Sequence, residues 1–148
     1  MVLEDCINFI LTNAQNTVFL RFRDKLAQHG VTPAQYAVLK CLWDHGEQSP
    51  SQLAQTLNLD ASTITGILGR MELKDLIKRK HSRKDRRAII IELRPLGKKL
   101  QAPIENTIHE TNREVLSLLS DHEYSQLRDY LNRIVETSNN FKDSDVLA

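Results

Sequence analysis

The sequence predicts a mainly helical fold with one small β-hairpin. Over most of the 148 residues, apolar side chains recur at spacings of three and four, and helix-start signals precede several of these segments. Two short β-type runs, "LIKRKH" and "AIIIEL", flank the charged segment "SRKDRR", which indicates a hairpin with a charged tip. A chain of this length is expected to form a single unit, residues 1–148.

The first 30 residues predict a long amphipathic helix. Further large apolar residues lie off its main stripe, so we expect more than one side of this helix to be covered, by its own domain and by a second subunit. Thr32 as N-cap and Pro33 in the first helical position then predict a second helix, which closes at Gly46. The stripe of the first helix consists of Ile7, Ile10, Leu11, Ala14, Val18, Phe22 and Leu26.

The next segment predicts two helices joined by a tight turn. Ser49 as N-cap, Pro50 after it and Gln52 in the third helical position form a capping box. This helix is expected to end near Leu57, and Asp60 can cap the helix that follows. The residues of that following helix that should face the core are Ile64, Ile67, Leu68 and Met71.

The opposite face of this last helix is small, polar and nearly free of acids. Hydroxyl groups and glycines allow close approach to another surface, and Ser and Thr can bond to base edges or phosphates. Burial of the helix on both sides is the structural alternative. We interpret the pair as a helix-turn-helix whose second helix enters the major groove of DNA. The face consists of Ser62, Thr65, Gly66, Gly69 and Arg70, with Thr63 at its margin.

The net charge of +1 conceals a strong asymmetry. Residues 70–99 carry twelve bases and four acids, a net +8, whereas the rest of the chain carries eight bases and fifteen acids, a net −7. Such clustering is typical of a surface that binds a polyanion, although a merely solvated face is the alternative. A helix-turn-helix followed by a basic hairpin is a winged helix, whose tip can reach the minor groove. The bases of the tip are Arg83, Lys84, Arg86 and Arg87.

Asp85 lies among these bases and is not expected to contact phosphate. Pairing with Arg70 or Arg87, which would fix the loop, is the more economical role. We therefore predict that Asp85 organises the wing.

Four motifs in a fixed order resemble the MarR (multiple antibiotic resistance regulator) family of bacterial transcription factors over most of residues 31–97. They are "SPSQLAQ", "DASTIT", "DRRA" and an "L-x-x-x-G" start to a long helix. The resemblance implies that Arg87 works at the minor groove and that Asp85 organises the wing. It also implies that the groove-facing start of the recognition helix holds Ser62, Thr63, Thr65 and Gly66.

The resemblance further implies a homodimer, in which helices within residues 1–30 and 96–141 interleave and residues 31–95 bind DNA. A two-fold dimer would set the recognition helices about 34–36 Å apart, one turn of DNA, and predicts a roughly palindromic double-stranded operator. Three residues depart from the family pattern: Asp75 at a turn that often has Gly, Arg94 at a helix cap, and Pro103, which is expected to kink the following helix.

The sequence predicts neither an enzyme nor a metal or cofactor site. The five histidines are scattered, and the chain has no HExxH motif, nucleophile elbow or Gly-rich phosphate loop. Winged helices also serve RNA binding and protein assembly, which is the alternative function. The apolar runs are too short to span a membrane and the start lacks a signal peptide, so we expect a cytoplasmic protein.

The resemblance implies a repressor that a small aromatic carboxylate or phenol releases from its operator. Some relatives instead sense peroxides through a cysteine on the first helix. Cys6 lies near that region, but an ungapped alignment puts the sensing position at Asn8, and Cys41 lies between core leucines. Ligand sensing is favoured, and a cysteine-based redox sensor remains the alternative.

Overall fold

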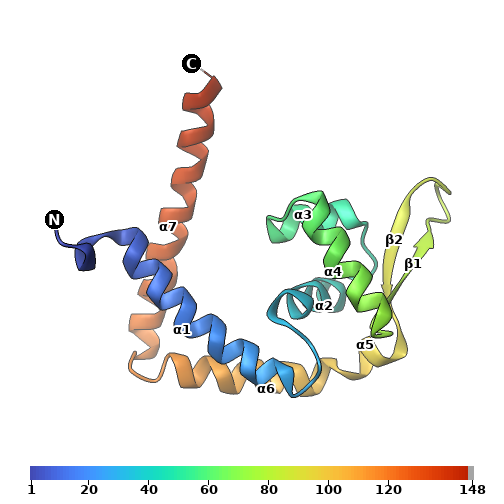
Figure 1. Ribbon diagram of the computed structural model, residues 1–148, viewed down its shortest axis with the longest axis horizontal. Coiled ribbons are helices and arrows are strands. Elements are labelled where there is room, and N and C mark those ends of the chain that lie inside the picture. Colours follow the sequence, from blue (N-terminus) through green and yellow to red (C-terminus); the bar gives the residue numbers. More distant parts are fainter. Residues whose placement is uncertain (147–148) are drawn as a thin grey trace. The chain divides into compact units, whose positions relative to one another are not determined.

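The computed structural model describes residues 1–146, with side chains through Phe141, as two compact units. The first unit covers Met1–Thr111 and the second begins at Asn112. The fold is mainly helical with a two-stranded antiparallel hairpin, as predicted (Figure 1). In chain order the elements are η1 (Leu3–Asp5), α1 (Ile7–Ala27), α2 (Pro33–His45), α3 (Pro50–Leu57), α4 (Ala61–Leu73), β1 (Ile77–His81), β2 (Ile89–Leu93), α5 (Pro95–Lys99), α6 (Gln101–Val115) and α7 (Asp121–Val146).

Capping residues begin the helices where the sequence predicts. The Thr32 side chain accepts a hydrogen bond from the backbone N–H of Gln35, and Ser49 accepts one from Gln52. In each box the glutamine side chain accepts a bond from the N-cap backbone in return, and a proline occupies the first helical turn. These local signals fix the starts of α2 and α3 independently of tertiary packing.

The core of the first unit is built from the inner faces of its helices and the base of the hairpin. All four predicted inward residues of α4 are buried, none more than 4% exposed. They pack in one apolar cluster with residues from α2, α3, both strands and α6. Packing of the whole inner face fixes the orientation of α4, so the opposite residues of the helix form its outer face. The other members of this cluster include Leu39, Leu42, Leu53, Ile77, Ile91 and Ile104.

The hairpin pairs Ile77 with Leu93 at its base and His81 with Ile89 near its tip. Gln48, between α2 and α3, adds a short bridge to this pair. Its backbone donates to and accepts from Ile91, at 3.3 and 2.7 Å. The sequence did not indicate this third segment, which anchors the wing to the helices beside it.

The turn after α4 forms in the usual way despite its aspartate. Asp75 adopts the left-handed conformation, with φ 59°. Its N–H bonds to the Glu72 carbonyl at 3.0 Å, and the Leu76 N–H bonds to the Met71 carbonyl at 3.1 Å. This is the paired hydrogen-bond pattern in which glycine is the common choice, so the departure from the family pattern leaves the turn intact.

The long helix predicted after the hairpin is divided in two. It is interrupted at Leu100, between α5 and α6, and Pro103 falls in the first turn of α6. Proline is tolerated there because an N–H at that position needs no partner in its own helix. The predicted kink therefore takes the form of a break, and Arg94 provides no side-chain cap to α5, as expected.

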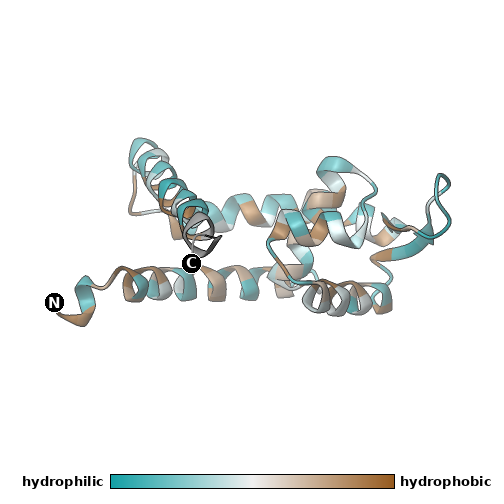
Figure 2. Ribbon diagram, turned by 90° about the horizontal axis from the view of Figure 1, so that it is seen from above, coloured by the Kyte–Doolittle hydropathy of each residue, from teal (hydrophilic) through white to brown (hydrophobic). Residues whose placement is uncertain are grey.

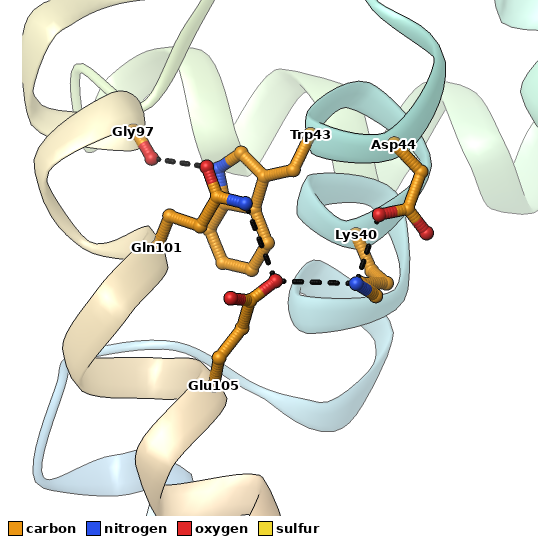
Figure 3. Close-up of polar contacts among 6 residues, drawn as sticks. All are labelled: Lys40, Trp43, Asp44, Gly97, Gln101 and Glu105. Atoms are coloured by element: carbon orange, nitrogen blue, oxygen red, sulfur yellow. Dashed lines mark hydrogen bonds and ion pairs between the residues drawn. The ribbon is translucent and has the colours of Figure 1, made fainter.

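Polar side chains join α2 to α5 and α6 within the first unit (Figure 3). The Trp43 Nε1 donates to the Gly97 carbonyl at 3.0 Å. Lys40 contacts the carboxylates of Asp44 at 2.8 Å and Glu105 at 3.1 Å. Hydrogen bonds from Gln101 and then Lys40 lower the pKa of Glu105, so its charged form is favoured. These contacts hold α2 to α5 and to the start of α6.

Both long terminal helices leave apolar side chains exposed. In α7, which begins at a capping box between Ser120 and Glu123, every described side chain is exposed. In α1 only Leu26 is buried. Figure 2 shows apolar bands along α1. The exposed large apolar residues include Ile7, Ile10, Val18, Phe19 and Leu20 on α1 and Leu127, Tyr130, Leu131 and Ile134 on α7.

Candidate DNA-binding surface

The turn between α3 and α4 sets the direction of α4. Asn58 ends α3 in the left-handed conformation, with φ 57°, and the Leu59 N–H returns to the Ala54 carbonyl at 2.9 Å. Asp60 then caps α4 by accepting from the backbone N–H of Thr63 at 2.7 Å. That bond, followed by hydrogen bonds from the side chains of Thr63 and Ser62, lowers the pKa of Asp60.

The predicted polar face of α4 lies on the surface. Arg70 and the three hydroxyl residues are exposed, and the two glycines of the face are half-buried. The alternative of a helix buried on both sides is therefore wrong. The structure brings together on this face Ser62, Thr63, Thr65, Gly66 and Arg70.

Leu73 was missed as a member of this face. It is 86% exposed and ends α4. At 100° per residue it falls in line with Ser62, Gly66 and Gly69, so the same helical spacing could have identified it. A large exposed apolar side chain here extends the face to the last turn of the helix.

Asp85 organises the tip of the wing through the backbone rather than through an ion pair. Its carboxylate accepts from the backbone N–H of Arg87 at 3.0 Å, and its carbonyl accepts from the N–H of Ala88 at 3.0 Å. Within the described residues Asp85 forms no ion pair with Arg70 or Arg87, so the predicted ion pair is wrong. A carboxylate that closes the turn in this way leaves both guanidinium groups available.

The bases of the wing tip are all exposed. Arg83 and Arg86 line an open hollow of about 610 Å³ together with His81 and Ser82. The Ser82 hydroxyl accepts from the backbone N–H of Lys84 at 3.2 Å, which shapes this side of the loop. The predicted wing residues thus lie together on one loop: Arg83, Lys84, Arg86 and Arg87.

The bases of strand β1, in contrast, are paired with acids. Lys78 and Lys80 both contact Glu92, at 2.9 and 2.7 Å, and Arg79 contacts Glu72 at 2.6 Å. Lys80 also contacts Glu47, which precedes the bridge to the hairpin. Within the part of the chain that the structure describes, Arg70 and the four tip bases form no ion pair. The strand of the hairpin is therefore largely neutralised, whereas the outer face of α4 and the wing tip keep their positive charge.

The base of the wing should lose stability in acid. Hydrogen bonds from Lys80 and then Lys78 lower the pKa of Glu92 from 4.5 to about 2. Because the folded-state pKa is lowered, the stabilisation is fully present above about pH 4.5 and is lost as the pH falls toward 2. We expect Glu92→Gln to lower the free energy of unfolding at pH 7, by an amount that shrinks below pH 4.5. Urea titrations of both proteins across this range check it, and a difference independent of pH would contradict it.

Among the described residues, no group of three or more His, Cys, Asp or Glu side chains could hold a metal ion. No helix within residues 1–146 is long and apolar enough to cross a membrane.

The sequence and fold place this surface in a known family. Residues 31–89, from the start of α2 to the wing, match the profile of the MarR family. The organic hydroperoxide resistance transcriptional regulator of Bacillus subtilis is 30% identical over 140 residues, which cover 93% of this chain and 92% of that protein. The chain belongs to the MarR family. It is a DNA-binding transcriptional regulator with a winged helix-turn-helix fold.

Solved structures of MarR-type regulators extend this likeness. A probable transcriptional regulator from Pseudomonas aeruginosa is 32% identical, with a TM-score of 0.84 over 90% of this chain and 99% of that one. A mutant of MarR from E. coli, solved with operator DNA, is 19% identical, with a TM-score of 0.82 over 86% of this chain and 92% of that one. The similarity to the E. coli protein is a similarity of fold.

Proposed function

We propose that this MarR-family protein binds double-stranded operator DNA as a homodimer, with α4 in the major groove and the wing tip at the adjacent minor groove. In this proposal residues 31–95 bind DNA and residues 1–30 and 96–141 supply the dimerisation helices. The observation that carries it is the division of charge. The bases of β1 are paired with acids, whereas Arg70 and the tip bases are exposed and unpaired within the described residues.

The dimer is supported by the exposed apolar side chains of the terminal helices. A helix whose apolar stripe faces water is stabilised when a partner covers it. On α7, Leu131 and Ile134 are 38% and 44% exposed, and on α1, Ile10 and Phe19 are 45% and 41% exposed. A two-fold dimer would present two recognition helices to half-sites one helical turn apart, which requires a roughly palindromic operator.

Binding to duplex DNA is favoured over RNA binding by the composition of the α4 face. Single-stranded RNA readers use exposed aromatic side chains on which bases stack. The outer face of α4 instead offers hydroxyl groups, two glycines, one arginine and one leucine, and neither it nor the wing tip carries an aromatic residue. Hydroxyl groups and arginine suit base edges and phosphates in a groove.

Regulation by a small aromatic or phenolic effector, which releases a repressor from its operator, is the second part of the proposal. The thiol alternative is not supported at Cys41, which is 8% exposed. Burial raises the pKa of that thiol and so reduces the reactive thiolate. We further propose a cytoplasmic regulator without catalytic activity, since a transcription regulator acts where the DNA is.

The test is the loss of one wing arginine. Arg87→Ala should weaken operator binding by about 10-fold, because it removes a charge that reaches the minor groove. Its backbone N–H, which the Asp85 carboxylate needs, stays in place, so the melting temperature should not change. Gel-shift titration at fixed salt, with thermal melting of the same samples, measures both. Unchanged operator affinity would rule out the wing assignment.

A further inference from the structure

We propose that Arg70 reads a guanine in each half-site and that Gly66 is the residue that positions its guanidinium group. This inference rests on the proposed function, because it requires α4 to lie in the major groove.

The guanidinium group of Arg70 lies over Gly66, one turn closer to the N-terminus of α4. A Cβ atom built on Gly66 would lie 3.6 Å from Nη1 and 3.8 Å from Nη2 of Arg70. Long side chains on a helix lean toward its N-terminus, which accounts for this direction. Helix-turn-helix proteins contact base edges from the N-terminal part of the recognition helix. The charge of Arg70 therefore reaches the part of α4 that meets the bases.

The hydroxyl groups near Gly66 have their hydrogens engaged inside the protein. Ser62 donates to the Asp60 carboxylate at 2.9 Å, and Thr65 donates to the Ala61 carbonyl at 2.7 Å. These hydroxyls keep lone pairs with which to accept hydrogen bonds. The charged donors that this face can direct at a base pair thus belong to Arg70.

No acid in the described residues competes for Arg70. Glu72, two residues away, pairs with Arg79, and Asp85 bonds to the backbone of the wing. A free guanidinium group offers two parallel donors. Guanine presents two adjacent acceptors, O6 and N7, in the major groove, whereas adenine presents N7 beside a donor. Guanine is therefore the base that matches Arg70.

Gly66 and Gly69 differ in what surrounds them, so an effect on the position of Arg70 can be told apart from the general effect of a glycine on the helix. Both are on the outer face of α4, but nothing lies within 4 Å of a Cβ built on Gly69. At Gly66 an alanine methyl would make ordinary contact with the guanidinium, whereas a leucine would fill the space it occupies. Gly66→Leu should displace Arg70, and Gly66→Ala and Gly69→Ala should not.

The experiment begins with selection of high-affinity duplexes from a randomised library by the full-length protein. In the selected duplex, each guanine is then replaced in turn by 7-deazaguanine, which lacks the N7 acceptor. We expect one guanine in each half-site at which the replacement weakens binding by about 10-fold. That sensitivity should disappear in Arg70→Ala and in Gly66→Leu, and it should persist in Ser125→Ala, an exposed position on α7 outside the proposed DNA surface. Thermal melting verifies that the variants are folded.

Four results would overturn the inference. Arg70→Ala could weaken all duplexes equally and keep the sensitivity to 7-deazaguanine, which would make Arg70 a phosphate contact. Gly66→Leu could keep the sensitivity, which would remove the positioning role of Gly66. If the wild-type protein enriches no sequence, the proposed function fails as well, whereas enrichment of a site that does not depend on Arg70 contradicts the inference alone.

Discussion

Replacing Gly97 with alanine is expected to lower the free energy of unfolding by about 3 kcal/mol. A Cβ at this position would lie 2.3 Å from the carbonyl oxygen of Leu76 and 3.1 Å from Cδ2 of Leu93. The first of these atoms belongs to the backbone and cannot turn away. It also accepts the N–H of Arg94 at 3.0 Å. To relieve the overlap, α5 would have to move away from the turn that follows α4.

The same movement would strain the contact between α2 and α5, because the Gly97 carbonyl accepts the Trp43 indole N–H. Urea unfolding monitored by the fluorescence of this tryptophan, the only one in the chain, measures the loss. Gly69→Ala is the matched control. Nothing lies within 4 Å of the added methyl group, and alanine should raise helix stability by about 1 kcal/mol. Equal effects of the two substitutions would contradict the close packing at Gly97.

Charges on the apolar stripe of α7 should separate the dimer. Leu131 and Ile134 are partly exposed in one chain, so glutamate at both positions can reach water there at small cost. In a dimer that covers this stripe, the same carboxylates would be buried without partners, which costs several kcal/mol. Leu131→Glu combined with Ile134→Glu should therefore give a monomer. Operator affinity should fall about 100-fold or more, because the two half-sites are no longer bound together.

Analytical ultracentrifugation gives the mass of the double variant, and gel-shift titration gives its affinity. Ser125→Glu is the control, since it adds a charge on the opposite side of α7 by helical spacing. It should leave both the dimer and the affinity unchanged. A double variant that remains a dimer would show that the stripe of α7 is not part of the dimer interface.

The parts of the fold that depend on local chemistry could be predicted from the sequence. The starts of α2, α3 and α4 follow from Thr32, Ser49 and Asp60, because a capping side chain bonds within three residues of itself. The inner face of α4 follows from the helical period. The hairpin follows from its two β-type runs, and the family resemblance agrees with their order.

Contacts between distant segments could not be predicted in the same way. The sequence shows that residues 70–99 are basic, but not that Glu47, Glu72 and Glu92 neutralise the strand and leave the tip charged. It suggested an ion pair for Asp85, whereas the carboxylate accepts a hydrogen bond from a backbone N–H two residues away. The position of the Arg70 guanidinium group over Gly66 depends on the side-chain rotamer of Arg70, which composition and helical period do not determine.

We expect this MarR-family protein to bind one DNA sequence in preference to others. The most direct test is titration of the purified protein against fragments of its own upstream intergenic DNA, with random duplex as competitor at fixed salt. The division of charge between strand and tip, together with the family, predicts tight binding to one fragment that resists the competitor. Weak binding that is equal for every duplex would contradict it.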